Sequence, residues 1–316
     1  MEPLARKILV VGGNGFIGSA VCKAALARGM RVTSISSSGQ PYRTPKGHTP
    51  AWTSKVEWQK ADALLPKTYS HILPEVNAVV HTLGTLLEDS RYKTALANKS
   101  ILGLVGAFAN GSGNPLERGG RGSYEVMNRD SALRVCEAFV SSQPLPETTD
   151  VRPFIYISAE DIFRPLIPAR YIETKREAEQ GIAQLVRDRP HHRGVFVRPS
   201  LVYHAHYRPL TSPLAALIDL SASLHASLPN GFPTPSAVLR ALGSAFPSSP
   251  ESQMPSPLNS VANALSIPPI HVEHVAEAIC VALDPARNVR GVVGVKEMRE
   301  LIGWSEKGKV PQPGHA

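Results

Sequence analysis

Residues 7–21 read KILVVGGNGFIGSAV, an apolar strand that leads through a glycine-rich turn into an amphipathic helix. Gly12, Gly15 and Gly18 form a GxxGxxG pattern. Gly12 permits a tight turn, Gly15 lets the backbone approach a pyrophosphate, and Gly18 allows the helix to pack closely on the strand. The helix N-terminus offers free N–H groups and a partial positive charge to phosphates. The stretch therefore predicts a dinucleotide site, with a glycine turn needed only for packing as the alternative.

Strands and helices alternate beyond this stretch up to about residue 203. Such alternation predicts an α/β fold with a Rossmann-like, doubly wound parallel sheet. Right-handed crossovers then bring the carboxyl ends of the strands to one ligand-binding edge. We expect further strands at residues 31–35, 56–60, 77–81, 154–158 and 194–197, and helices at 15–28, 123–140 and 171–188.

The composition changes after residue 203, and we predict a division there. Residues 1–203 would form the NAD(P)-binding Rossmann-like domain, and 204–316 a Ser/Pro-rich helical cap plus a C-terminal helix (271–283) that completes the domain. Leucines 214, 217, 224 and 228 give the cap an apolar helical face. This face either covers the active-site edge or meets a lipid or protein partner. We expect residues 99–123 to be a loop insertion and the tail after Trp304 to fray.

Composition limits the classes of function. The net charge of +8 favours anionic partners, but the basic residues are dispersed, so we expect no nucleic acid. No stretch reaches the roughly 20 apolar residues that a membrane helix needs, and we expect no secretory signal. The 3 cysteines, Cys22, Cys136 and Cys280, are expected to be buried and reduced. The histidine pairs 204/206 and 271/274 lack the neighbours of a metal site, so we expect no metal.

Tyr171 and Lys175, four residues apart in YIETK, point the same way on a helix. An ammonium near a phenol lowers the phenol's pKa, and such a tyrosine can exchange a proton with a substrate oxygen during hydride transfer. Lys175 can also bind the nicotinamide ribose, and Ser158 can donate a hydrogen bond to the same substrate oxygen. A surface helix pair is the alternative, and Arg176 and Glu173 are interpreted as solvated charges.

The choice of nucleotide depends on the end of the second strand. An acid there would hold the ribose hydroxyls of NAD, but the sequence has Ser36-Ser37-Ser38. NADP is therefore slightly favoured over NAD, although no arginine follows the strand at once. Asp62, after the third strand, is placed to touch the adenine amino group, or is an ordinary loop acid.

Several motifs together resemble the extended or atypical short-chain dehydrogenase/reductase superfamily, which includes NAD-dependent epimerases and dehydratases. The motifs are GGNGFIG (12–18), VVHTLG (79–84), YISA (156–159), YIETK (171–175), VRPSLVY (197–203) and HVEHVAEAI (271–279). Longer stretches, such as YEVMNRDSA (124–132), resemble fungal mitochondrial accessory proteins of coenzyme Q biosynthesis. These proteins are in turn similar to the nucleotide-binding accessory subunit of respiratory complex I.

The resemblance implies roles for individual residues. Ser158, Tyr171, Lys175 and Asn128 would be catalytic, and Lys175 would also bind the cofactor. The other cofactor-binding residues would be Gly12, Gly13, Asn14, Gly15, Phe16, Ile17, Gly18, Ser36, Ser37, Asp62, Leu83, Gly84, Arg198, Pro199 and Ser200. Two departures from the family pattern are Ser37, where a basic residue is usual, and Leu83-Gly84, where an alanine pair is usual.

The resemblance also implies a place in the cell and a set of partners. It implies the matrix side of the mitochondrial inner membrane, allows peripheral contact with that membrane, and implies association with proteins of the coenzyme Q biosynthetic complex. Two hypotheses follow. One is an NAD(P)-dependent oxidoreductase supporting ubiquinone biosynthesis, and the other is a non-catalytic, nucleotide-binding assembly or regulatory subunit.

Overall fold

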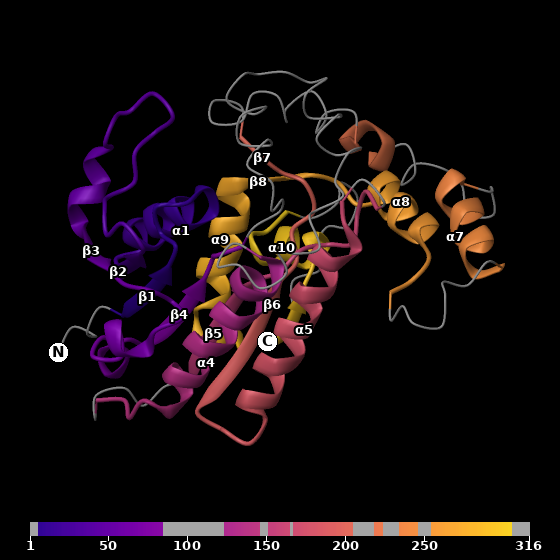
Figure 1. Ribbon diagram of the computed structural model, residues 1–316. Helices are drawn as coiled ribbons and strands as arrows, with labels where there is room; N and C mark the ends of the chain where they lie inside the picture. The colour runs from indigo at the N-terminus through magenta and orange to yellow at the C-terminus, as the bar shows by residue number, and fades with distance from the viewer. Residues whose placement is uncertain are drawn as a thin grey trace, which may run out of the picture.

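Seven parallel strands form the central sheet of the computed structural model, which describes residues 6–84, 123–145, 151–164, 167–204, 218–223, 234–245 and 254–304 (Figure 1). The strand order is β3-β2-β1-β4-β5-β6-β9, and all neighbouring strands pair in parallel. The strands are β1 (Lys7–Val11), β2 (Arg31–Ser36), β3 (Val56–Lys60), β4 (Ala78–His81), β5 (Arg152–Ile157), β6 (His192–Val197) and β9 (Gly291–Val293). The predicted Rossmann-like, doubly wound sheet is confirmed.

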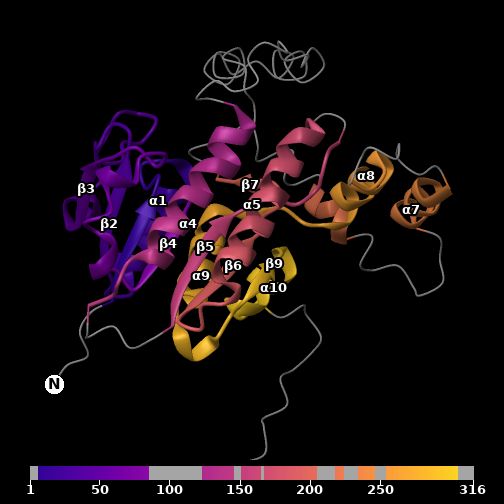
Figure 2. The same ribbon diagram turned by 60° about the horizontal axis from the view of Figure 1, so that its bottom comes forward.

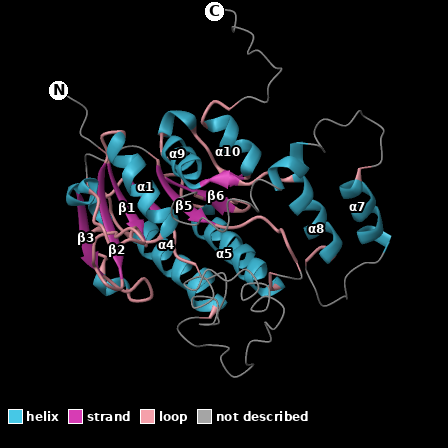
Figure 3. Cartoon of the chain, turned by 90° about the horizontal axis from the view of Figure 1, so that it is seen from above, coloured by secondary structure: helices cyan, strands magenta, loops and turns pink. Residues whose placement is uncertain are grey.

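Helices cover both faces of this sheet, as the view from above shows (Figure 3). One face carries α1 (Phe16–Ala27), α9 (Val272–Ala282) and α10 (Val295–Leu301). The other carries α4 (Ser131–Ser141) and α5 (Ala169–Arg187). Each face has its own cluster of buried apolar side chains, because a parallel sheet is buried on both sides. The three cysteines are buried and free, as expected.

The first helix shows how closely the sequence specifies local structure. Gly29 follows α1 with a φ of +75°, a left-handed conformation that glycine adopts without steric cost. The Gly29 N–H donates to Leu26 O (3.0 Å) and the Met30 N–H donates to Ala25 O (3.0 Å). These bonds satisfy carbonyls at the end of the helix. The chain then enters β2 beside β1, so the glycine loop lies at the carboxyl edge of the sheet.

Two helices, α7 (Pro235–Ala245) and α8 (Pro257–Ser266), lie at the opposite end of the molecule from β3 (Figure 2). Hydrogen bonds connect α8 to the segment after β5. The Arg164 N–H donates to Ser260 Oγ (2.9 Å), and Asn263 Nδ2 donates to Asp161 O (3.1 Å). The division at residue 203 stays a prediction. Leucines 214, 217, 224 and 228, most of the insertion at 99–123, and the tail after Trp304 lie outside the described residues.

Several elements were not expected from the sequence. β9 extends the sheet beyond β6, and β7 (Val202–Tyr203) pairs with β8 (Ile270–His271) in a separate ribbon. The predicted helix at 123–140 begins instead as a π-helix, η5 (Glu125–Asp130), and continues as α4. Short 3₁₀ turns occur at η1 (Ala51–Lys55), η2 (Pro66–Thr68), η3 (Leu73–Glu75) and η6 (Pro285–Arg287). Strands of two or three residues are too short to give a periodic pattern.

Candidate functional site

The glycine loop connects β1 to α1 at the carboxyl edge of the sheet. Gly12 has a φ of +87°, and its N–H donates to Ile35 O in β2 (2.8 Å). The Gly15 N–H donates to Gly12 O (2.9 Å), which closes the turn. Gly15 is then the N-cap of α1, and no side chain caps the helix there. An N-terminus without a side-chain cap leaves backbone donors for an anion.

The three glycines of the motif differ in the space around them. A Cβ added to Gly18 would lie 2.2 Å from Gly12 O and 2.8 Å from Thr82 Oγ1, so no side chain fits there. A Cβ on Gly15 would meet only Gly12 O, at 3.2 Å, and Gly15 is exposed. Gly18 therefore permits packing of α1 on β1, whereas Gly15 leaves an open approach to the loop.

A cavity of about 570 Å³ lies at the carboxyl edge of the sheet, where β1, β2 and β3 end. Four residues predicted to contact the cofactor line it: Ser36, Ser37, Asp62 and Leu83. Asn14 Nδ2 donates to Ser38 Oγ (3.1 Å) and joins the loop to the end of β2. Lys60, the last residue of β3, also lines the cavity. Lys60 was not among the residues predicted from the sequence, although its position two residues before Asp62 could have indicated it.

Asn128, Lys175 and Gly84 come together at the end of β4. A Cβ on Gly84 would lie 2.7 Å from Lys175 Nζ and 3.1 Å from Asn128 Oδ1. Lys175 is buried, and its Nζ donates to Ile157 O (2.9 Å) above the ring of Tyr156. Burial lowers the pKa of Lys175 to about 7. The structure thus brings together three residues that lie far apart in the sequence, at positions 84, 128 and 175.

The π-helix η5 positions Asn128. π-helical turns are rare and often occur at functional sites. The buried Asn128 side chain donates through Nδ2 to Thr174 Oγ1 (3.3 Å), and its backbone O accepts from Tyr156 Oη (2.5 Å). These contacts attach η5 to α5 and β5 and fix the direction of the amide.

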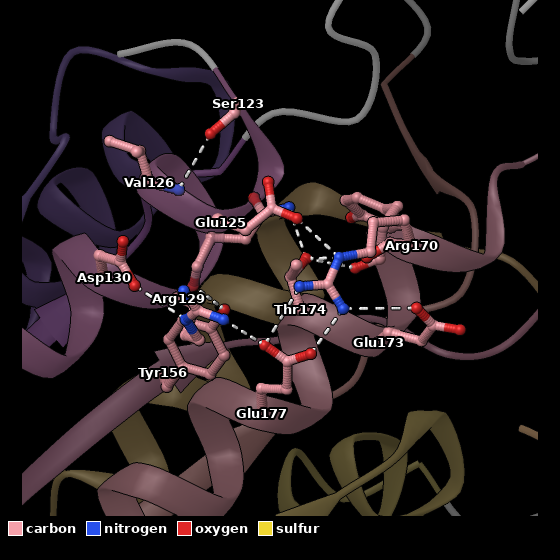
Figure 4. Close-up of polar contacts among 12 residues, drawn as sticks. Ser123, Glu125, Val126, Arg129, Asp130, Tyr156, Arg170, Glu173, Thr174 and Glu177 are labelled. Carbon is pink, nitrogen blue, oxygen red and sulfur yellow. Dashed lines mark hydrogen bonds and ion pairs between the residues drawn. The ribbon is translucent and has the colours of Figure 1, made fainter. Parts of the chain in front are cut away.

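Ion pairs on the outer side also attach η5 to α5, as the close-up shows (Figure 4). Arg170 Nε contacts Glu125 Oε1 (2.6 Å), and Arg170 Nη1 contacts Glu177 Oε1 (2.6 Å). Arg129 Nη1 contacts the other oxygen of Glu177 (2.6 Å). Two arginines thus share one carboxylate between the two helices. Each exposed pair contributes little alone, but a network restrains the segment that carries Asn128.

Tyr171 lies on the first turn of α5, and its ring packs edge-on against Tyr124 (centroids 5.9 Å apart). Burial raises the pKa of Tyr171 to about 12, with Arg176 acting in the opposite direction. The expectation that the Lys175 ammonium lowers this pKa is not met, because the Lys175 amine is directed to Ile157 O. Tyr171 is therefore a protonated phenol at neutral pH.

Ser158 directly follows β5 and is buried. Arg176 Nη1 donates to Ser158 Oγ (3.0 Å), and Nη2 donates to Ala159 O (2.8 Å). Arg176 also contacts Glu179 Oε1 (2.8 Å). The interpretation of Arg176 as a solvated charge was wrong, because its guanidinium is directed inward to the sheet edge. Glu179, three residues further along the same helical face, could have indicated that Arg176 takes part in an ion pair.

Arg198, predicted to lie near the nicotinamide, is held by the same carboxylate. Its Nε donates to Glu179 Oε1 (2.9 Å), and its Nη2 contacts Glu179 Oε2. Burial opposes ionisation of Glu179, but the hydrogen bond from Arg198, the charge of Arg176 and a hydrogen bond from Ser158 outweigh it and lower the pKa of this carboxyl. Nearby, Pro199 O accepts from the Glu160 N–H (2.9 Å), and Ser200 Oγ donates to Pro268 O (2.6 Å). Ser158 therefore belongs to a buried charge network.

The histidines set aside in the sequence analysis lie near one another. The rings of His204 and His271 are 4.9 Å apart, and His274 is 5.7 Å from His271. His206 lies outside the described residues. In the part of the chain that the structure describes, no group of three or more His, Cys, Asp or Glu side chains is arranged to hold a metal ion. No helix within the described ranges has the length and apolar character to cross a membrane.

Comparison with known proteins identifies relatives. The model of the NAD dependent epimerase/dehydratase family matches residues 8–105. The Saccharomyces cerevisiae protein named MIOREX complex component 2 is 36% identical over 212 residues, which are 63% of this chain and 74% of that protein. An uncharacterized Arabidopsis thaliana protein named as chloroplastic is 28% identical over 201 residues, and the match spans about half of it (51%).

Solved structures share the fold. A short-chain dehydrogenase/reductase from Serratia marcescens has a TM-score of 0.54 and 14% identity, with 93% of this chain and 98% of that chain covered. An oxidoreductase of the short-chain dehydrogenase/reductase family from Burkholderia thailandensis has a TM-score of 0.52 and 14% identity, with 94% and 97% covered. At this identity the likeness establishes the fold alone.

Proposed function

This chain belongs to the NAD dependent epimerase/dehydratase family, and we propose that it is an NAD(P)-dependent oxidoreductase supporting ubiquinone biosynthesis in mitochondria. The observation that carries the proposal is the meeting of Gly84, Asn128 Oδ1 and Lys175 Nζ at one edge of the sheet. The uncapped N-terminus of α1 lies at the same edge. One extended ligand could therefore bind its phosphates to the backbone N–H groups of α1 and place its reactive end beside Lys175.

The residues present fit a pyridine dinucleotide. The glycine loop would hold the pyrophosphate, because Gly15 leaves its approach open. Ser36, Ser37, Asp62 and Leu83 would surround the adenosine. Lys175 would reach the nicotinamide ribose near Gly84. When bound, the nucleotide would supply the hydride donor or acceptor that the side chains lack.

Tyr171 and Lys175 would transfer the proton that the substrate oxygen takes up during reduction. The phenol of Tyr171 stays protonated at neutral pH, so it acts as an acid toward a substrate oxygen during reduction. Lys175, with a pKa of about 7, takes up or releases a proton near physiological pH. Asn128 restrains the segment beside Lys175 through its bond to Thr174.

A second function, a non-catalytic assembly or regulatory subunit, is favoured by the surroundings of Ser158. Its oxygen accepts from Arg176, and its hydroxyl donates to Glu179, so the Glu179 carboxylate competes with a substrate oxygen for the Ser158 proton. A relative named as a component of a complex fits this alternative. In both cases we propose the matrix side of the inner membrane and partners in the coenzyme Q biosynthetic complex. The net charge of +8 suits peripheral contact with acidic lipids.

Complementation separates the two functions. Cells lacking this protein would receive the unaltered chain, Tyr171→Phe or Gly15→Asp, and coenzyme Q would be measured by mass spectrometry. An oxidoreductase requires that both variants fail. A non-catalytic subunit requires that Tyr171→Phe restores coenzyme Q while Gly15→Asp fails. Normal coenzyme Q in cells without the protein would refute the proposed pathway.

A further inference from the structure

A basic residue, Lys60, lines the cavity at the carboxyl ends of β1, β2 and β3. Lys60 ends β3 and pairs in register with Ser36, the last residue of β2. Both residues line the cavity together with Ser37 and Asp62. Lys60 therefore lies next to Ser36, at the end of the strand where the ribose of a bound dinucleotide would lie.

The chain after β2 folds back over Lys60. Gly39 has a φ of +65°, and a Cβ there would lie 2.7 Å from the Lys60 N and 2.8 Å from its Cβ. The Gly39 N–H donates to Ser36 Oγ (3.1 Å) and stabilises this turn. The turn therefore holds the backbone of Lys60 beside the end of β2, while the lysine side chain remains exposed.

Within the described ranges, the Lys60 ammonium forms no ion pair or hydrogen bond with another residue. Lys7 and Lys23 pair with glutamates, but none of the ion pairs or hydrogen bonds within the described ranges involves the Lys60 side chain. Asp62, the acid that lines the cavity, accepts the Leu64 N–H at Oδ1 (3.0 Å). The Lys60 ammonium is thus available to an anion in the cavity, whereas the Asp62 carboxylate already accepts a backbone N–H of the following turn.

The three serines differ in their hydrogen bonds. Ser36 Oγ accepts from Gly39, and Ser38 Oγ accepts from Asn14 Nδ2 (3.1 Å) and from the Gln40 N–H (3.2 Å). The exposed Ser37 hydroxyl has no hydrogen bond in the described part of the chain. Ser37 therefore retains a donor at the cavity wall, beside Lys60.

We propose that Lys60 and Ser37 form a subsite for the 2′-phosphate of NADP(H), so that the chain selects NADP(H) over NAD(H). The inference rests on the proposed nucleotide site and names its cofactor. A hydroxyl and an ammonium both donate to a phosphate dianion, and charge-assisted bonds are the strong ones. The ribose hydroxyls of NAD would find serine where an acid is usual.

Calorimetric titration of the full chain with NADP⁺ and NAD⁺ tests the subsite. The unaltered chain should bind NADP⁺ more tightly. Lys60→Gln should weaken NADP⁺ binding by roughly tenfold or more and leave NAD⁺ within about twofold. Lys55→Gln is the matched control, because it removes the same charge just before the opposite end of β3 and should change neither affinity.

The outcomes separate this inference from the proposed function. Tighter binding of NAD⁺ by the unaltered chain, or an unchanged NADP⁺ affinity in Lys60→Gln, would overturn the subsite while leaving a dinucleotide site in place. An equal loss in Lys55→Gln would show only a general effect of charge and would also overturn it. Failure of both nucleotides to bind the folded chain would refute the proposed function itself.

Discussion

Replacing Gly18 and Gly15 separately by alanine should distinguish two roles in the glycine motif, because Gly18 permits packing and Gly15 leaves space for the nucleotide. In Gly18→Ala the new Cβ would stand 2.2 Å from Gly12 O and 2.8 Å from Gly13 Cα. Relieving the first contact requires the loop and helix to separate by about 1 Å, and such overpacking costs about 3 kcal/mol. Alanine regains up to about 1 kcal/mol from its helix propensity. The net loss in the free energy of unfolding is then about 2 kcal/mol.

Thermal unfolding measures this loss, which corresponds to a fall in Tm of roughly 3 °C for a chain of 316 residues. Gly15→Ala should lower the Tm by less than about 2 °C, because its Cβ meets only Gly12 O at 3.2 Å. The same variant should weaken dinucleotide binding by about tenfold, since the methyl group enters the approach to the pyrophosphate. An unchanged Tm in Gly18→Ala, or unchanged binding in Gly15→Ala, would refute this division of roles.

Two further perturbations test buried groups outside the loop. Burial lowers the pKa of His81 to about 3, so between pH 6.5 and pH 3 the unfolded chain binds a proton that the folded chain refuses. As the pH decreases through this window, the free energy of unfolding should decrease by about 1.4 kcal/mol per pH unit. The His81→Phe variant should show a flatter slope when free energies from denaturant melts are plotted against pH, and an unchanged slope would contradict the assignment. Arg176→Gln should lower the free energy of unfolding by about 2–3 kcal/mol at pH 7, because it breaks the network at Ser158 and Glu179. If urea titrations gave Arg176→Gln and the unaltered chain the same free energy of unfolding, Arg176 would be only a solvated charge.

The sequence predicted the frame of the fold because its strands are apolar runs bounded by clear turn signals. Ile8 to Val11 is such a run, and Gly12 and Gly29 mark the turns that follow β1 and α1. β9 escaped prediction because three residues give no period, although they complete the sheet beside β6. The π-helical start at Glu125 also escaped, because the shift of hydrogen bonds leaves no compositional mark.

The candidate site was predictable in its members and less so in its electrostatics. Spacing alone placed Tyr171 and Lys175 on one helical face. It could not show that the Lys175 amine is directed to Ile157 O, or that burial outweighs the charges around Tyr171. The contacts of Arg176 and Lys60 depend on neighbouring strands, so only the three-dimensional structure reveals them.

The proposed function requires that the amino end of α1 receives a pyridine dinucleotide. Calorimetric titration of the purified, unaltered chain with NADPH tests it most directly, with circular dichroism showing that the chain is folded. We predict saturable binding of one nucleotide per chain. Absence of binding heat with NADPH, NADP⁺, NADH and NAD⁺ at millimolar concentration, confirmed by an unchanged Tm, would contradict the account.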